Sequence, residues 1–434
     1  MQTHFSLAAL ADPDIAQAEK ILRACVHCGF CTATCPTYLI TGDELDSPRG
    51  RIYLIKEMLE NERPADARTA HHIDRCLSCL SCMTTCPSSV HYMHLVDHAR
   101  AHIEKSFRRP VADRMLRAAL AFVLPRPAIF RRALRAAKYV APVAPFLPTR
   151  LHALLTLAPK TAPPPSDVDR PQVFPAKGAR KMRVALLNGC AQTALDTHIN
   201  EATVRLLTRH GVEVVVAQGA GCCGALPHHL GKVDQSHAFA RRNIDAWTRE
   251  IETSGLDGIV VNASGCGTSV KDYGFMFRGD AAFAEKAARI SDLARDVSEV
   301  VEGLELQAGE APRLKVAYHS ACSLQHGQKI TRQPIAALER AGFEALAVPE
   351  GHICCGSAGT YNLLQSEMAD ELRARKVANI ESVSPDVVAA GNLGCMVQIR
   401  AGTAIPVVHT VELLDWATGG PKPQLLTPSS LRGA

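Results

Sequence analysis

The stretch "CVHCGFCTATCP", from Cys25 to Pro36, places four cysteines within eleven residues and ends on a proline. The same spacing, C-x2-C-x2-C-x3-C-P, returns as "CLSCLSCMTTCP" from Cys76 to Pro87. Three thiolates on one tight loop can bind three irons of a single cubic cluster, whereas the fourth is carried away by the turn that follows. The two runs therefore indicate two metal centres in one small domain.

Both runs resemble the ligand loops of bacterial two-cluster ferredoxins, in which the fourth cysteine of each run binds the other cluster. The resemblance implies two [4Fe–4S] clusters with crossed ligand sets. Zinc fits less well, because zinc knuckles pair C-x2-C motifs across a longer span. His27 lies inside the first run and is expected to bind no metal. The implied sets are Cys25, Cys28, Cys31 and Cys86 for one cluster, and Cys76, Cys79, Cys82 and Cys35 for the other.

The composition is that of a globular protein: 434 residues are 47% hydrophobic and 21% charged, which allows one to three domains. The first residues, "MQTHFSLAALADPD", lack the basic start and apolar run of a signal peptide, and no run of eighteen apolar residues follows. We therefore expect a cytoplasmic protein. In that reducing compartment, sixteen cysteines suggest metal binding before disulfides.

Between the two runs, "DSPRGRIYLIKEMLE" predicts a helix that is capped by Ser47 and begins at Pro48. Its apolar residues recur at helical spacing. Arg49 and Arg51 either offset the negative charge of thiolate-bound clusters or lie on a solvated helix face, and the sequence leaves both interpretations open.

The other eight cysteines form an internal repeat. Cys322 follows Cys190 by 132 residues, and a Cys-Cys-Gly triplet recurs at the same offset. The flanking sequences agree, as "RVALLNGC" aligns with "KVAYHSAC". The two sets are Cys190, Cys222, Cys223 and Cys266, then Cys322, Cys354, Cys355 and Cys395.

Each half of the repeat is expected to be α/β. Short apolar runs such as "VALLN" and "VEVVVA" end at the cysteines, as buried parallel strands would. The carboxyl ends of such strands meet at one edge of an open sheet, where these folds place their sites. Each half should thus bring four thiols together from three loops.

The C…CCG…GC repeat resembles the cysteine-rich domain of heterodisulfide reductase and related redox subunits. The fullest form of that domain ends in C-x2-C, whereas Ala263 and Asn392 stand at the first cysteine here, so the resemblance does not extend to a non-cubane cluster. A [4Fe–4S] cluster or zinc in one or both halves, and a vicinal disulfide in either Cys-Cys pair, remain open. His319 and His409, near strand ends, are expected to pack or hydrogen-bond rather than bind metal.

Over nearly its full length, the chain resembles the iron–sulfur subunits of glycolate oxidase, most clearly in "DSPRGRI" and "GAGCCGALPHHLG". The resemblance implies an electron-transfer subunit of an oxidoreductase complex, a flavin-dependent glycolate dehydrogenase, which passes electrons from flavoprotein subunits toward quinone or another acceptor. No flavin or nicotinamide fingerprint is visible, so the chain alone is not expected to oxidise substrate. The alternatives are a heterodisulfide-reductase-like thiol–disulfide subunit, the equivalent subunit of a glycerol-3-phosphate or lactate dehydrogenase, and repeats that hold structural zinc.

The implied fold is α+β followed by α/β: a helical two-cluster ferredoxin-like domain, then two tandem cysteine-rich (CCG) repeats. The expected divisions are 1–100 for the cluster domain, 101–180 for a basic helical segment and proline-rich linker, and 181–310 and 311–434 for the repeats. Within the linker, 161–181 is expected to be exposed and irregular.

Residues 100–150 contain twelve Lys or Arg and only two acids, while the whole chain has a net charge of +5, so the positive charge is local. Such a segment can lie peripherally on the cytoplasmic face of the inner membrane, contact an acidic partner, or form an ordinary helical hairpin. Nucleic acid is not expected, because no interleaved aromatics or nucleic-acid-binding fold accompany the basic residues.

Overall fold

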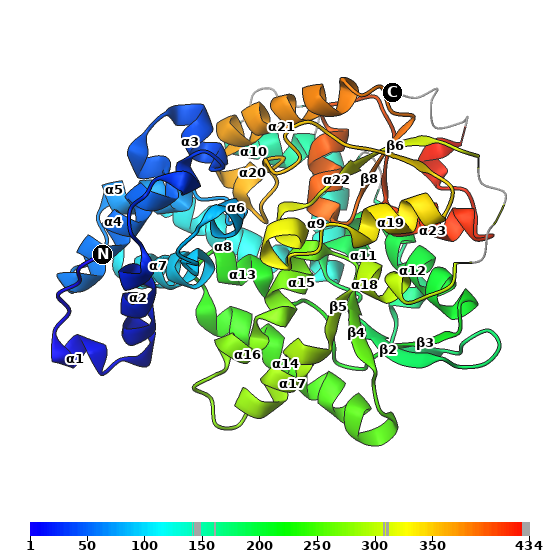
Figure 1. Cartoon of the computed structure of the whole chain (residues 1–434), viewed down its shortest axis with the longest axis horizontal. Helices are drawn as coiled ribbons and strands as arrows, with labels where there is room; N and C mark the ends of the chain where they lie inside the picture. The colour runs from blue at the N-terminus through cyan, green and yellow to red at the C-terminus, as the bar shows by residue number, and fades with distance from the viewer. Residues whose placement is uncertain (141, 143–148, 160–161, 307–308, 310–311, 428–434) are drawn as a thin grey trace.

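The computed structural model describes residues 1–140, 142, 149–159, 162–306, 309 and 312–427. A helical N-terminal region is followed by two parallel sheets with helices around them (Figure 1). This order confirms the predicted fold class. Among the described helices, none is both long and apolar enough to cross a membrane.

Short helices build the N-terminal region. Several begin at a proline in the first turn, where the missing N–H costs nothing, as at Pro13, Pro36 and Pro48. The predicted Ser47 cap is confirmed, since its hydroxyl accepts a hydrogen bond from the Gly50 N–H at 3.0 Å. The elements are α1 (Leu7–Leu10), α2 (Pro13–Ala24), η1 (Phe30–Thr32), α3 (Pro36–Thr41), η2 (Glu44–Asp46), α4 (Pro48–Glu60), α5 (Ala67–Asp74), α6 (Ser81–Thr85) and α7 (Tyr92–Ser106).

The middle segment corrects one expectation. Three helices, α8 (Val111–Val123), α9 (Pro127–Val140) and α10 (Thr149–Thr156), precede a short 3-10 turn, η4 (Asp167–Asp169). The stretch 161–181 was expected to be irregular throughout, but β1 (Gln172–Phe174) pairs antiparallel with β3 (Val212–Val216) of the first sheet. Phe174 packs against the core, so this strand covers an edge that would otherwise be exposed. Residue 161 itself lies outside the described residues.

The first repeat forms a five-stranded sheet in the order β1-β3-β2-β4-β5, parallel except for β1. The strands at the cysteine loops lie where the sequence predicted them. The elements after β1 and besides β3 are β2 (Met182–Leu186), α11 (Ala191–Leu195), α12 (His198–Arg209), α13 (Ala225–His229), α14 (Val233–Ser254), β4 (Gly258–Val261), α15 (Ser264–Lys271), α16 (Tyr273–Met276), α17 (Ala284–Leu293), β5 (Ala294–Asp296) and α18 (Val297–Glu302).

The second repeat forms a four-stranded parallel sheet in the order β7-β6-β8-β9. The predicted boundary at 310/311 lies outside the described residues, and the other boundaries stay predictions. The elements are β6 (Lys315–His319), the π-helical turn η5 (Ser323–Gly327), α19 (Gln333–Arg340), β7 (Glu344–Leu346), α20 (Tyr361–Leu364), α21 (Ser366–Glu381), β8 (Val387–Ala390), α22 (Leu393–Arg400), β9 (Val407–His409), α23 (Thr410–Ala417) and η6 (Gln424–Leu426).

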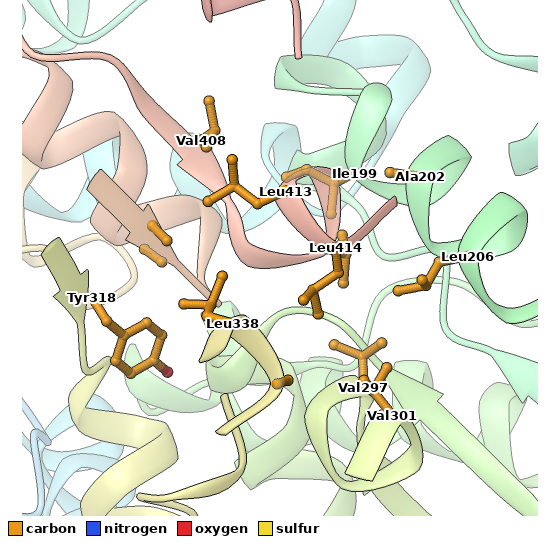
Figure 2. Packing of buried hydrophobic residues seen from close by; sticks show 14 of the residues in the cluster. Ile199, Ala202, Leu206, Val297, Val301, Tyr318, Leu338, Val408, Leu413 and Leu414 are labelled. Atoms are coloured by element: carbon orange, nitrogen blue, oxygen red, sulfur yellow. The ribbon is translucent and has the colours of Figure 1, made fainter. Parts of the chain in front are cut away.

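The two repeats share one hydrophobic core. Figure 2 shows Leu413 and Leu414 of α23, in the second repeat, among Ile199 and Leu206 of α12, in the first. All four side chains are buried to 0–2% exposure, so separating the repeats would expose a large apolar surface. The repeats therefore hold their two cysteine sets in a fixed relation.

Candidate metal centres

The two N-terminal cysteine runs form two loops with the same backbone conformation. His27 and Ser78, 51 residues apart, both adopt a positive φ (55° and 50°), and Gly29 and Leu80 do the same at 85° and 62°. A non-glycine residue in this conformation costs about 1–3 kcal/mol and persists where its surroundings enforce it, often at functional sites. The Ser78 N–H points to the Cys76 sulfur at 3.5 Å. This loop geometry was not predicted from the sequence.

The structure brings the predicted crossed sets together. Two small cavities lie between the loops, and each is lined by three cysteines of one run and the fourth cysteine of the other. Cys86, at the end of α6, reaches the first cavity, and Cys35, at the start of α3, reaches the second. The first cavity is lined by Cys25, Cys28, Cys31 and Cys86, with Cys82 beside them; the second is lined by Cys35, Cys76, Cys79 and Cys82.

The two sets differ in their distance from solvent. Cys28 of the first set is exposed, and Val26 and Phe30 beside it expose 66% and 60% of their surface. Every member of the second set is buried. One set therefore reaches the molecular surface, while the other lies inside the molecule.

Two arginines lie near the thiols of the N-terminal sets. Arg51 is 1% exposed and directs one guanidinium nitrogen to the Cys35 sulfur at 3.9 Å, so it does not lie on a solvated helix face. Arg49 instead pairs with Glu44 at 2.7 Å near the surface. Burial raises the pKa of Cys31 to about 11, so a thiolate there needs a bound cation. Buried, converging thiols fit an iron–sulfur cluster, whose irons would supply the positive charge that the thiolates need.

In the first repeat, the four cysteines follow three neighbouring strands. Cys190 follows β2, the Cys222-Cys223 pair follows β3, and Cys266 lies in α15 after β4. Gly224 has a φ of 87°, and a β-carbon there would lie 2.8 Å from the Ser236 carbonyl oxygen. The Cys-Cys-Gly turn therefore needs its glycine.

The second repeat copies this arrangement and packs against the N-terminal region. The sulfurs of Cys322 and Cys354 lie 3.8 Å apart. Cys79 packs in one hydrophobic cluster with Cys354, and its thiol interacts electrostatically with Cys322. Gly356 has a φ of 91°, as Gly224 does at the equivalent position. The buried N-terminal set is thus the neighbour of the second repeat.

None of the sixteen cysteines forms a disulfide, and this includes the vicinal disulfide that the sequence left open for either Cys-Cys pair. The predicted hydrogen-bonding role of His409 is confirmed: its Nε2 lies 2.8 Å from the Asn262 carbonyl oxygen, and its Nδ1 accepts from the Val411 N–H at 3.2 Å. His319 differs, because its buried Nε2 has no hydrogen-bond partner among the described residues.

A cavity of about 270 Å³, which sequence reasoning did not find, lies over the first repeat. All four cysteines of that repeat line it, and most of the remaining wall is apolar. Helices α8 and α9 contribute Leu124, Phe130 and Leu134 to the wall, and the second repeat contributes residues such as Leu363. The sequence held no local signal for this cavity, because its walls come from several segments that lie far apart in the chain.

Comparisons with known proteins agree with this geometry. Residues 21–90 match the 4Fe-4S dicluster domain family, and residues 184–271 and 316–400 match the cysteine-rich domain family. Cluster binding by the N-terminal region is therefore shown. A crystal structure of a hypothetical protein from Helicobacter pylori is similar in fold, with a TM-score of 0.53 and 11% identity over 97% of this chain and 74% of that chain.

Three curated relatives extend the match. The chain is 29% identical to lactate utilization protein A of Bacillus licheniformis, over 54% of this chain and 99% of that protein. It is 29% identical to the probable glycolate oxidase iron-sulfur subunit of Bacillus subtilis, over 92% and 95% of the two chains. It is 44% identical to the glycolate oxidase iron-sulfur subunit of Escherichia coli, over 96% of this chain and 99% of that protein. With both cluster-binding loops and both Cys-Cys-Gly repeats in place, the chain belongs to the family of glycolate oxidase iron–sulfur subunits.

Proposed function

We propose that the chain transfers electrons within a complex that oxidises glycolate, between flavoprotein subunits and a quinone. The observation that supports this best is the pair of crossed thiol sets, one at the surface and one buried. When bound there, [4Fe–4S] clusters accept and release electrons one at a time. The proposed ligands are the crossed sets: Cys25, Cys28, Cys31 and Cys86, and Cys76, Cys79, Cys82 and Cys35.

The surface around Cys28 is the proposed docking site of the flavoprotein. Val26, Phe30 and Tyr53 are exposed apolar side chains, and Arg49 lies among them. Exposed apolar groups rimmed by charge are typical of protein interfaces. Electron transfer also requires close approach, which this exposed set permits and the buried set does not.

The purified chain, loaded with its clusters, should not reduce an artificial dye when glycolate is added, because no described part of it offers a hydride acceptor. Adding the flavoprotein subunits should restore turnover. Assays with glycolate, lactate and glycerol 3-phosphate in parallel would identify the substrate. Turnover by the flavin-free chain alone would overturn the electron-carrier role, and a complex active only with lactate would replace glycolate as the substrate.

The cavity over the first repeat is the proposed site of the acceptor, beside a further cluster on Cys190, Cys222, Cys223 and Cys266. Two polar atoms at its wall, Gln192 Oε1 and His229 Nδ1, are buried and have no hydrogen-bond partner among the described residues. A flat, largely apolar molecule with two oxygen atoms, such as a quinone, would bury its ring against leucines. One of its carbonyl oxygens would accept from His229 Nδ1 when that nitrogen carries the ring proton, and the hydroxyl of the reduced quinol would donate to Gln192 Oε1.

Filling the cavity should block this acceptor. Leu226 lines the cavity, and Leu226→Trp would fill part of it with a larger side chain. Reduction of a quinone analogue by the complex should then fall at least about tenfold, while reduction of an artificial dye should persist. Leu39→Trp, on the exposed face of α3, is the matched control. Unchanged quinone reduction in the Leu226 variant would place the acceptor elsewhere.

The basic helices are proposed to hold the chain peripherally on the cytoplasmic face of the inner membrane. Helix α9 presents Phe130 and Leu134 to the cavity, whereas Arg132 and Arg135 are exposed. An apolar acceptor could therefore pass from the lipid surface to the cavity along this helix. Arg131 does not belong to that surface: it is buried, and its guanidinium donates to the carbonyl oxygens of Pro163 and Thr193. Arg131 therefore does not contribute to the exposed positive charge that the sequence indicated for residues 100–150.

Arg132→Glu together with Arg135→Glu should weaken binding to vesicles that contain anionic lipid, because each reversal removes an attraction of about 1 kcal/mol and adds repulsion. Binding of the unaltered protein should also fall as salt rises. Lys286→Glu with Arg289→Glu makes the same charge change on the exposed face of α17 and should have little effect. Equal loss in both double variants would indicate a non-specific charge effect.

Thiol–disulfide chemistry finds less support. Cys355 is 1% exposed, which leaves no path for a disulfide substrate to reach its sulfur directly, and Cys223, although it lines the cavity over the first repeat, is only 2% exposed. The cysteines of the repeats are therefore proposed as metal ligands.

A further inference from the structure

His319 is a buried histidine whose ring has an unsatisfied hydrogen-bonding nitrogen among the described residues. It ends strand β6, is 2% exposed, and its Nε2 is enclosed without a hydrogen-bond partner among the described residues. Leaving a buried polar group unsatisfied costs about 1–3 kcal/mol, so such groups usually mark an ion, a water or a function.

Two thiols face this ring. One ring nitrogen of His319 and the sulfurs of Cys355 and Cys395 all lie within 4.8 Å of one another. Zinc binds thiolate at about 2.3 Å and imidazole at about 2.0–2.1 Å, so three donors this close can bind one ion with small adjustments. A cubic cluster instead offers one protein ligand position on each of four separate irons, which spreads its ligands to the corners.

A hydrogen-bond donor and a buried positive charge lie beside these thiols. The Asn392 side-chain amide donates to the Cys395 sulfur at 3.3 Å. Lys376 is 1% exposed, and its positive charge interacts with the thiols of Cys355, Cys354 and Cys395. A divalent ion with three thiolates and a neutral imidazole would have a net charge of −1, which the buried ammonium of Lys376 would balance.

The first repeat has a different residue at the same position. The alignment of "RVALLNGC" with "KVAYHSAC" places Leu187 opposite His319. Leu187 lines the large cavity, and Cys266 is only partly buried, whereas Cys355 and Cys395 are 1% and 2% exposed. Structural zinc sites fill all four coordination positions with protein side chains, which suits the enclosed second repeat. Catalytic metal sites keep one position open, which suits the first repeat beside its cavity.

We propose that the second repeat holds a single zinc ion on His319, Cys355 and Cys395, with the neighbouring Cys354 as the fourth ligand. The two repeats then have separate tasks: the open first repeat faces the acceptor, and the closed second repeat fixes the fold beside the buried N-terminal set. The inference rests on the proposed role of the repeat cysteines as metal ligands. It departs from the expectation that His319 would only pack or hydrogen-bond.

The test is metal analysis of the full chain in its complex, prepared anaerobically with both iron and zinc supplied. The unaltered protein should contain about one zinc per chain, with an X-ray absorption spectrum that fits a mixed sulfur and nitrogen shell. His319→Leu, which installs the residue of the first repeat, should lose most of the zinc and keep the iron. His319→Cys should keep the zinc in an all-sulfur shell.

His210→Leu is the matched control, because it removes another buried histidine of the repeats far from the cysteines, and it should leave zinc unchanged. Iron without zinc in the unaltered protein, or an unchanged zinc shell in His319→Leu, would overturn the inference. If His319→Leu does not fold, the spectra of the unaltered protein and of His319→Cys decide. Glycolate turnover is a separate readout: its absence with zinc present would refute the proposed function and leave this inference standing.

Discussion

Cys35→Ser is expected to destroy the buried cluster and to leave the surface cluster intact, although Cys35 belongs to the same run as the surface set. The reason is the crossing of the loops: Cys35 lines the cavity that Cys76 and Cys79 share, and Arg51 directs its guanidinium to the Cys35 sulfur. Loss of the Cys35 thiolate, one of four ligands of a buried site, also leaves the Arg51 guanidinium without the sulfur to which it points. About half of the N-terminal iron should be lost, together with one of two electron paramagnetic resonance signals.

Cys28→Ser is the matched control. It lies in the same run, seven residues earlier, and lines the other cavity at the exposed side. It should alter the other resonance signal and spare the one that Cys35→Ser removes. If both variants altered the same signal, the ligands would belong to their own runs and the crossed sets would be wrong.

The chemistry-bearing parts of this fold could be predicted because their signals are local. Metal-ligand spacing within twelve residues identified the loops, and a repeat offset of 132 residues identified the two sheets. The apolar runs before Cys190 and Cys322 predicted strands that end at the thiols, and β2 and β6 lie there. In each case, neighbours in the sequence decide the structure.

The remaining features depend on contacts between distant segments. Strand β1 has only three residues and needs β3 to exist as a strand. Arg131 looks like its neighbours in the sequence, and only the carbonyl groups of Pro163 and Thr193 distinguish it. His319 was likewise indistinguishable from a packing histidine until Cys355 and Cys395 were placed beside it. Sequence patterns show which residues can act as metal ligands or hydrogen-bond donors, but they do not show which of these residues the fold brings together.

Asp46 links the residues around the buried cluster site through a carboxylate that has no contact with solvent. Its carboxylate is fully buried and lies 2.8 Å from His72 Nδ1, 2.7 Å from an Arg75 nitrogen and 3.5 Å from an Arg51 nitrogen. Burial alone would raise the pKa of Asp46, but the hydrogen bond from His72 and the charges of the two arginines outweigh it and lower the pKa. The backbone carbonyl of Asp46 also accepts from Thr37 at 2.7 Å, next to Cys35.

Asp46→Asn should therefore be severely destabilising, because it keeps the shape but leaves the Arg51 guanidinium, 1% exposed, without its counter-charge. Removing one partner of a buried ion pair costs about 3–5 kcal/mol. Glu44→Gln makes the same chemical change two residues earlier, in a pair with Arg49 at 2.7 Å whose Glu44 side chain is 45% exposed, and should cost only about 0.2–1 kcal/mol. Anaerobic denaturant titrations, followed by cluster absorbance and by circular dichroism, measure both free energies. Equal losses in the two variants would show that Arg51 does not depend on Asp46, and that the buried thiolates and their cluster neutralise it instead.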